Sequence, residues 1–228
     1  MTLSALPTRP ELTAAVKASL VAAFAEAAPK PSPFRHWLLS EVFPAGMTRD
    51  LCHLPFPCPD LHGISGKREL HNDQRRYFDA DNNARFDACA AVADAFQSGE
   101  VARAIEATTG ADLSGAFVRL EYAQDTDGFW LEPHTDLGVK RFTMLIYISD
   151  SPGQTDLGTD IFSDPQTWAA RPPFTDNTAL VFVPGANTWH GLARRPIGGV
   201  RKSIIMNYVT DDWRAREQLA YPATPVRA

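Results

Sequence analysis

Five polar residues in the C-terminal half of the chain have types and spacings that could do metal chemistry. His134 and Asp136 are two positions apart, so on an extended strand their side chains point to the same face. A second imidazole, His190, follows much later, and Arg201 and Ser203 lie beyond it. Two histidines and a carboxylate are the facial triad that binds non-haem Fe(II). Because an Arg can bind a carboxylate through two parallel hydrogen bonds, we expect an iron site beside a socket for a carboxylate-bearing co-substrate.

Each of these residues, taken singly, has an ordinary explanation. The His134–Asp136 pair could belong to a polar turn, and His190 could be a surface histidine. Arg201 could be a solubilising charge on an edge strand. Their positions argue for a site, because each lies at the start or end of a strand-like run. In a barrel, such positions meet at one mouth.

The elements that must position these residues are strands. Apolar or alternating runs separated by Gly-, Pro- and Asp-containing turns predict strands at 116–122, 142–148, 179–183 and 203–209. Several short strands of this kind are typical of a barrel or a double-sheet jelly roll. We expect His134 and Asp136 at the start of a strand.

The N-terminal half is predicted to be mostly helical. A capping box at Thr8–Glu11 begins a helix that runs to about Pro29. Further helices are expected at 34–42, after Thr48, at 86–99 and at 101–110. The fold class is therefore α+β with a mainly β core. We expect a single domain, 1–228, in which 1–110 is helical support with a possible lid loop at 55–77, and 111–210 is the jelly-roll core.

Composition and charge restrict the class of protein. The 228-residue chain is 44% hydrophobic with a formal net charge of −5, which disfavours a nucleic-acid-binding protein. The three cysteines are an odd, sparse set typical of reduced thiols, and a zinc site using Cys52 and Cys58 has no strong pattern. With no membrane-spanning run and no signal sequence, we expect a cytoplasmic protein without a membrane partner. The sequence does not indicate an oligomeric state.

In this order the polar residues resemble the motif of the 2-oxoglutarate and Fe(II)-dependent dioxygenases. These enzymes are built on a double-stranded β-helix, which is a jelly roll. The family pattern is His-x-Asp, a distal His and then an Arg. This sequence has, in order, His134-Thr135-Asp136, His190 and Arg201-Lys202-Ser203. The resemblance covers about residues 117–209 and extends more loosely to 33–37.

The resemblance implies roles for these residues. The triad would bind Fe(II), and Arg201 and Ser203 would bind the distal carboxylate of 2-oxoglutarate. The segment around Tyr122 looks like that of the prolyl-hydroxylase-type subset, in which such a Tyr contacts 2-oxoglutarate; a core aromatic is the alternative. The implied reaction consumes O₂ and 2-oxoglutarate and yields succinate, CO₂ and a hydroxylated product. Related halogenases have a small residue where this chain has Asp136, so hydroxylation is favoured, with desaturation or cyclisation left open.

The substrate is less well indicated. Arg119, Glu121, Trp130 and Tyr147 lie on or beside the strands expected at the mouth, and each could instead be an ordinary strand residue. We expect a small-molecule substrate, such as an amino acid, a sugar derivative or a secondary metabolite. A protein or peptide hydroxylase, a nucleic-acid demethylase and a non-catalytic jelly-roll binding or sensor protein are the alternatives. A cupin-type metal protein would usually supply more His ligands and a Glu.

Overall fold

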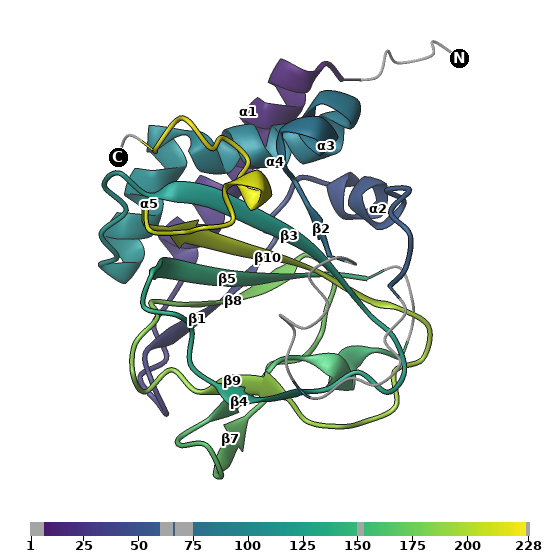
Figure 1. Ribbon diagram of the computed structural model, residues 1–228, viewed down its shortest axis with the longest axis vertical. Helices are drawn as coiled ribbons and strands as arrows, with labels where there is room; N and C mark the ends of the chain where they lie inside the picture. Colours follow the sequence, from purple (N-terminus) through teal and green to yellow (C-terminus); the bar gives the residue numbers. More distant parts are fainter. Residues whose placement is uncertain (1–6, 60–65, 67–74, 150–152, 227–228) are drawn as a thin grey trace.

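The chain folds around two antiparallel sheets that face each other (Figure 1). The computed structural model describes residues 7–59, 66, 75–149 and 153–226. The larger sheet contains, in spatial order, β1 (His36–Ser40), β8 (Thr178–Phe182), β5 (Lys140–Ile148), β10 (Arg201–Val209), β3 (Phe117–Asp125) and β2 (Arg76–Tyr77). The smaller sheet contains β4 (Leu131–His134), β9 (His190–Leu192), β6 (Asp160–Phe162) and β7 (Trp168–Ala170). This arrangement confirms the predicted jelly-roll core.

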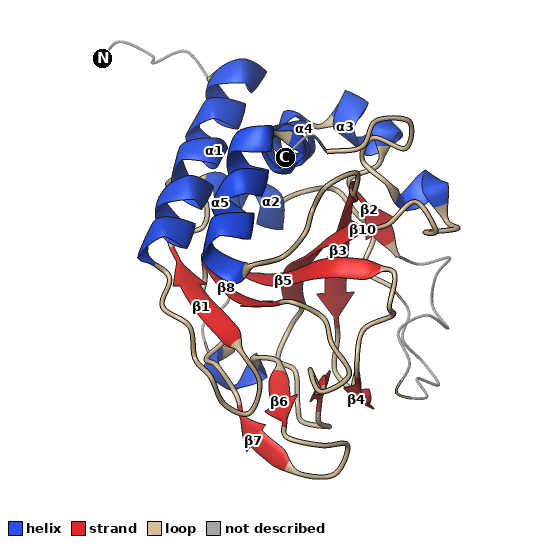
Figure 2. Ribbon diagram, turned by 90° about the vertical axis from the view of Figure 1, so that its left-hand side faces the viewer, coloured by secondary structure: helices blue, strands red, loops and turns tan. Residues whose placement is uncertain are grey.

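Helices cover the outer face of the larger sheet, opposite the smaller one (Figure 2). They are α1 (Arg9–Glu26), α2 (Met47–Cys52), α3 (Ala80–Arg85), α4 (Asp87–Gln97) and α5 (Gly99–Thr109). Two short 3-10 helices, η2 (Thr155–Leu157) and η3 (Arg216–Gln218), lie in the C-terminal half. Among the described residues, no helix has the length and apolar character needed to cross a membrane.

Local sequence signals explain the boundaries of the long helices. The Thr8 backbone N–H donates to the Glu11 carboxylate where α1 begins, as the capping signature predicts. Val16, Leu20 and Phe24 form the buried stripe of α1. Helix α5 ends at Gly110, whose left-handed backbone (φ +76°) suits a residue without a Cβ.

The central strands are buried on both faces, and residue parity decides which environment each side chain enters. On β3 and β10, even-numbered side chains such as Leu120 and Met206 pack into the core beneath the helices. Odd-numbered side chains such as Glu121 and Ser203 line the space between the sheets. The helices therefore provide a rigid backing, and the polar face of the same strands is left for a site.

The helix predicted at 34–42 is wrong, because β1 occupies this stretch and pairs with β8 from His36↔Phe182 to Ser40↔Thr178. Trp37 is buried beneath the helices, whereas the neighbouring Leu38 packs between the sheets. This alternation has the period of a strand, but five residues are too few for the period to separate strand from helix. The short strands of the smaller sheet and helix α3 also lacked a clear signal in the sequence.

The predicted lid lies largely outside the described residues. Residues 54–59 have no regular structure, and the segment ends in the two-residue strand β2, which pairs with β3. Residues 60–65 and 67–74, on which the lid prediction falls, are not described.

The smaller sheet is organised around the fully buried carboxylate of Asp160. Its Oδ1 accepts hydrogen bonds from Trp168 Nε1 (2.9 Å) and Arg171 Nε (2.8 Å). Its Oδ2 accepts from Ala193 N (2.7 Å) and Arg195 Nη1 (2.8 Å). Burial alone would raise the pKa of Asp160, but these bonds hold the pKa below its ordinary value.

We expect Asp160→Asn to lower the free energy of unfolding by about 3 kcal/mol at pH 7, because it leaves two partly buried guanidinium groups without their fully buried carboxylate partner. Since the folded-state pKa is depressed, the stability from ionised Asp160 is complete above the ordinary value of 3.8 and is lost as pH falls below it. Urea denaturation at pH 7 and below pH 3.8 measures both effects. The control is Asp156→Asn, whose exposed carboxylate contacts the same Arg171 and should contribute less than about 1 kcal/mol. Equal losses from the two variants would contradict this account of Asp160.

Candidate active site

Two histidines and one aspartate converge between the sheets. His134 ends β4 and is the antiparallel partner of His190, which begins β9. Asp136 lies just beyond β4 rather than within a strand, so the expected strand start is corrected to a strand end. One ligand atom from each of the three residues lies within 4.8 Å of the other two.

The two imidazoles are oriented as metal ligands would be. The Nδ1 atom of His134 lies 2.8 Å from Glu132 O, and that of His190 lies 3.0 Å from Thr188 O. Because a carbonyl oxygen only accepts, each Nδ1–H donates, and Nε2 is the ring nitrogen left to bind a metal. Burial lowers the pKa of His190 to about 4, so its ring is neutral near pH 7. Neutral imidazole is the form that binds metals.

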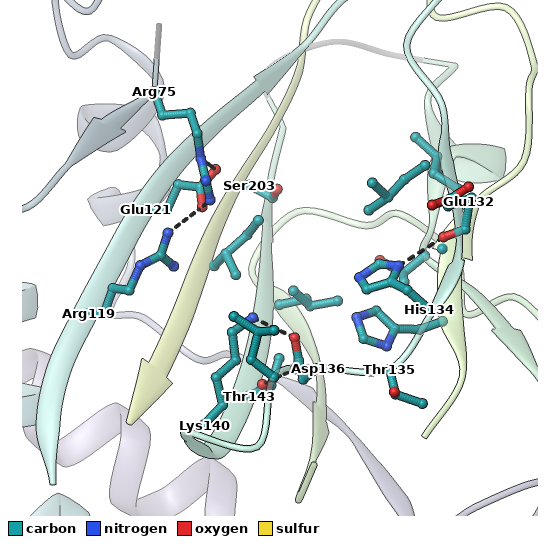
Figure 3. A pocket seen from close by; sticks show the side chains of 18 of the residues that line it. Arg75, Arg119, Glu121, Glu132, His134, Thr135, Asp136, Lys140, Thr143 and Ser203 are labelled. Carbon is teal, nitrogen blue, oxygen red and sulfur yellow. Dashed lines mark hydrogen bonds and ion pairs between the residues drawn. The ribbon is translucent and has the colours of Figure 1, made fainter. Parts of the chain in front are cut away.

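The third member of the triad is a charged carboxylate held in place by two neighbours. Figure 3 shows Lys140 and Thr143 beside the carboxylate of Asp136. The Lys140 ammonium contacts Oδ1, and Thr143 Oγ1 donates to Oδ2 (2.6 Å). Burial would raise the pKa of Asp136, but the charge of Lys140 and these hydrogen bonds hold the pKa well below its ordinary value. Two imidazoles and an anionic carboxylate are a donor set that fits Fe(II).

Arg201 and Ser203 are buried on the same face of β10. The guanidinium of Arg201 donates through Nε to Leu157 O (2.7 Å) and through Nη1 to Asp125 Oδ2 (2.6 Å). The ring of Phe174 lies 4.9 Å from its central carbon. These contacts fix the orientation of the guanidinium group, while its Nη2 atom has no hydrogen-bond partner among the residues that the structure describes. Arg201 is thus a preorganised cation in the cavity wall.

The triad, Arg201 and Ser203 line one cavity of about 440 Å³. Its apolar wall includes Leu145, Leu192 and Ile205. Arg75, Arg119 and Glu121 add a charged wall, in which Glu121 pairs with both guanidinium groups (Figure 3). A volume of this size is in the range of small-molecule sites. The structure therefore brings together all five residues that the motif singled out.

The remaining predicted residues have different positions. Arg119 and Glu121 line the cavity, but they also contact each other and are fixed in its wall. Tyr147 is buried beneath Arg201, and its hydroxyl accepts from Thr159 N (3.0 Å). Trp130 is not among the residues that line the cavity and packs against the guanidinium of Arg194 instead.

Tyr122 occupies the core beneath the helices rather than the cavity. Its hydroxyl donates to Leu51 O (2.9 Å), and its ring packs against Phe56 and Phe78. Because Tyr122 has the opposite parity to Glu121 on β3, it points to the other face of the sheet. This arrangement is not compatible with the expected contact with 2-oxoglutarate, and the alternative of a core aromatic describes Tyr122 correctly.

The motif does not include several residues that line the cavity or form hydrogen bonds with its lining residues. Strand parity predicts that Thr143 and Asn207 point to the inner face of the larger sheet. Thr143 lies two positions from Leu145 on β5, and Asn207 lies four positions from Ser203 on β10. Asp125 opposes Arg201 across the β3–β10 ladder, a pairing that needs the strand register. Arg75 is brought to Glu121 by the short strand β2, for which the sequence has no clear signal.

Comparisons with known proteins give matches among solved structures. No protein-family model matches the sequence, and no curated protein does. A prolyl-4-hydroxylase from Pseudomonas putida matches with a TM-score of 0.53 at 16% identity, over 92% of this chain and 99% of its own. A prolyl hydroxylase from Trichoplax adhaerens, in complex with a hypoxia inducible factor peptide fragment, matches with a TM-score of 0.59 at 12% identity. This match covers 91% of this chain and 93% of the other.

A third match is HygX from Streptomyces hygroscopicus with nickel, 2-oxoglutarate and hygromycin B bound. Its TM-score is 0.50 at 14% identity, over 77% of this chain and 82% of its own. At these identities the matches establish the fold. The chain therefore has the jelly-roll fold of the 2-oxoglutarate-dependent oxygenases, as the resemblance of its motif predicts.

Proposed function

We propose that the protein is an Fe(II)- and 2-oxoglutarate-dependent dioxygenase that hydroxylates a C–H bond of a small molecule. The observation that carries this proposal is the joint lining of one cavity by the triad and Arg201. A surface histidine and an edge-strand arginine would not be buried together. The fold is independent support, because it is shared with oxygenases of this type.

In this proposal, one group of cavity residues binds the metal and another binds 2-oxoglutarate. His134, Asp136 and His190 hold Fe(II). Hydrogen bonds at Nδ1 of each histidine and at Oδ2 of Asp136 keep the three side chains in a fixed orientation. Arg201 pairs with the distal carboxylate of 2-oxoglutarate, and the Ser203 hydroxyl adds a donor. When bound, iron and 2-oxoglutarate activate O₂, so that the substrate C–H becomes C–OH and 2-oxoglutarate becomes succinate and CO₂.

The rest of the wall positions the substrate and keeps out water. Leu145, Leu192 and Ile205 make an apolar lining, which favours a C–H-bearing group over water. The Arg75–Glu121–Arg119 cluster is a polar wall for a substrate with hydrogen-bonding groups. Since one cavity of about 440 Å³ must contain both co-substrate and substrate, a compact polar molecule is favoured.

A peptide is the second candidate, supported by the fold shared with the prolyl hydroxylase that is bound to a peptide fragment. The two candidates differ in what stimulates turnover. We expect amino acids, sugar derivatives or other metabolites to increase succinate formation by the iron-loaded protein, with an equal amount of hydroxylated product.

The measurement is a screen of such compounds beside proline-containing peptides, with succinate quantified and products identified by mass. Stimulation by peptides alone would overturn the small-molecule assignment. Absence of any 2-oxoglutarate-dependent succinate, with iron bound, would overturn the enzymatic proposal and favour a binding protein.

A further inference from the structure

A chain of hydrogen bonds leads from the metal-ligand candidate Asp136 into the wall of the cavity. Thr143 Oγ1 donates to Asp136 Oδ2 (2.6 Å). Asn207 Nδ2 donates to Thr143 Oγ1 (2.9 Å), and Arg119 Nη1 donates to Asn207 Oδ1 (3.1 Å). Arg119 is in turn held by Gln218 through Nε (3.0 Å). The first four residues therefore form a continuous line from the carboxylate to a buried cation.

The strand register builds this chain. Asn207 on β10 lies directly opposite Thr143 on β5 and Arg119 on β3. All three side chains lie on the inner face, where cross-strand neighbours are close enough to contact each other. Asn207 is fully buried, and Thr143 and Arg119 are only 1% and 2% exposed, so water does not replace these partners readily.

The cation at one end fixes the direction of every bond. A guanidinium has only donors, so the atom of Asn207 that faces Arg119 must be the carbonyl oxygen. The amide nitrogen then faces Thr143 and donates to its hydroxyl oxygen. The hydroxyl proton of Thr143 is therefore left for Asp136 Oδ2. No other assignment satisfies all four groups at once.

We propose that Thr143 and Asn207 are positioning residues that select which oxygen of Asp136 faces the metal. This inference rests on the proposed function of the triad. With Oδ2 held by Thr143, the carboxylate presents Oδ1, the oxygen that already faces a cation in this structure, the ammonium of Lys140. Arg119 sets the direction of the chain and reaches the carboxylate only through Asn207 and Thr143. Arg119 then acts mainly by holding Asn207 in the cavity wall, and not as a direct ligand of the substrate.

Two substitutions of Thr143 test the hydroxyl. Thr143→Val keeps the shape but removes the donor, and should weaken binding of the metal about 10-fold to 100-fold, the range for partners of ligating groups. Thr143→Ser keeps the donor and should bind metal like the wild type. The matched control is Thr109→Val, which removes a buried hydroxyl that donates to Ile105 O in α5, away from the cavity.

A substitution of Asn207 tests the direction of the chain. Asn207→Asp can still accept from Arg119, but it cannot donate to Thr143 and instead accepts its hydroxyl proton. Asp136 then loses its orienting bond although Thr143 is intact. The added negative charge by itself would strengthen cation binding, whereas loss of orientation would weaken it, so the sign of the change separates the two effects.

The probe is Mn(II), whose free concentration is measured by electron paramagnetic resonance during titration of the apo-protein. The charge-transfer band of the anaerobic Fe(II)–2-oxoglutarate complex is a second readout of the iron's environment. Circular dichroism melting of each apo-variant checks the fold, and Asn207→Asp carries the test should Thr143→Val not fold.

Weaker Mn(II) binding in Thr143→Val and Asn207→Asp, a shifted band, and near wild-type behaviour in Thr143→Ser are the expected results. Wild-type affinity and band in a folded Thr143→Val, equal losses in the Ser and Val variants, or tighter binding in Asn207→Asp would overturn the inference. If the wild type binds neither Mn(II) nor Fe(II), the proposed function itself fails.

Discussion

Replacing His134 with alanine is expected to abolish stable Fe(II) binding and to lower kcat/KM for hydroxylation on the order of 10³-fold or more, a loss of about 4 kcal/mol. The reason is that only Asp136 and His190 would remain as protein ligands. Iron content after dialysis and succinate formation measure the two effects. Fold stability should change little, because His134 ends a short strand and is not fully buried.

The matched control for this prediction is His53→Ala. His53 follows α2, its Nδ1 contacts Arg49 O, and it does not line the cavity. This variant should keep the iron content and the activity of the wild type. Retention of iron and activity by a folded His134→Ala would contradict the assignment of the triad.

Replacing Arg201 with methionine is the second large expected effect, on the co-substrate rather than the metal. The dissociation constant for 2-oxoglutarate should rise about 10²- to 10³-fold, because a fixed, desolvated cation opposite a carboxylate is removed. Fe(II) or Mn(II) binding should remain. Calorimetric titration of the metal-loaded protein with 2-oxoglutarate measures the change.

The loss of Arg201 also leaves Asp125 without its buried ion-pair partner, and this can reduce stability by itself. Arg195→Met is the matched control, since Arg195 pairs with the fully buried carboxylate of Asp160 but does not line the cavity. It should reduce stability and leave the affinity for 2-oxoglutarate unchanged. Equal affinity for 2-oxoglutarate in folded Arg201→Met and the wild type would contradict the assigned socket.

Much of the candidate site was predictable because residue type and strand parity carry the signal. The His134–Asp136 spacing, His190 and the Arg201–Ser203 pair needed only an approximate strand pattern to be placed in one site. Parity also separates Glu121, which faces the cavity, from Tyr122, which faces the helices. For Tyr122 the resemblance left two alternatives open, and parity favours the core aromatic over the contact with 2-oxoglutarate.

Other parts of the site depend on information that one sequence does not contain. The pairs Arg201–Asp125 and Arg119–Asn207 come from strand register, which long-range pairing determines. The short strands β4 and β9, which carry the two histidines, have three or four residues and show no periodicity. The sequence predicts a helix where β1 forms, because pairing with β8 at the edge of the larger sheet overrides a short and ambiguous local pattern.

The central claim is that one cavity holds iron and 2-oxoglutarate together. An anaerobic titration of the purified apo-protein with Fe(II) and then 2-oxoglutarate tests it most directly, by following the visible metal-to-ligand charge-transfer band. We predict that the band appears with the wild type at one iron per chain, is absent with His134→Ala and needs far more 2-oxoglutarate with Arg201→Met. A folded wild type that binds iron and shows no band at saturating 2-oxoglutarate would contradict the claim.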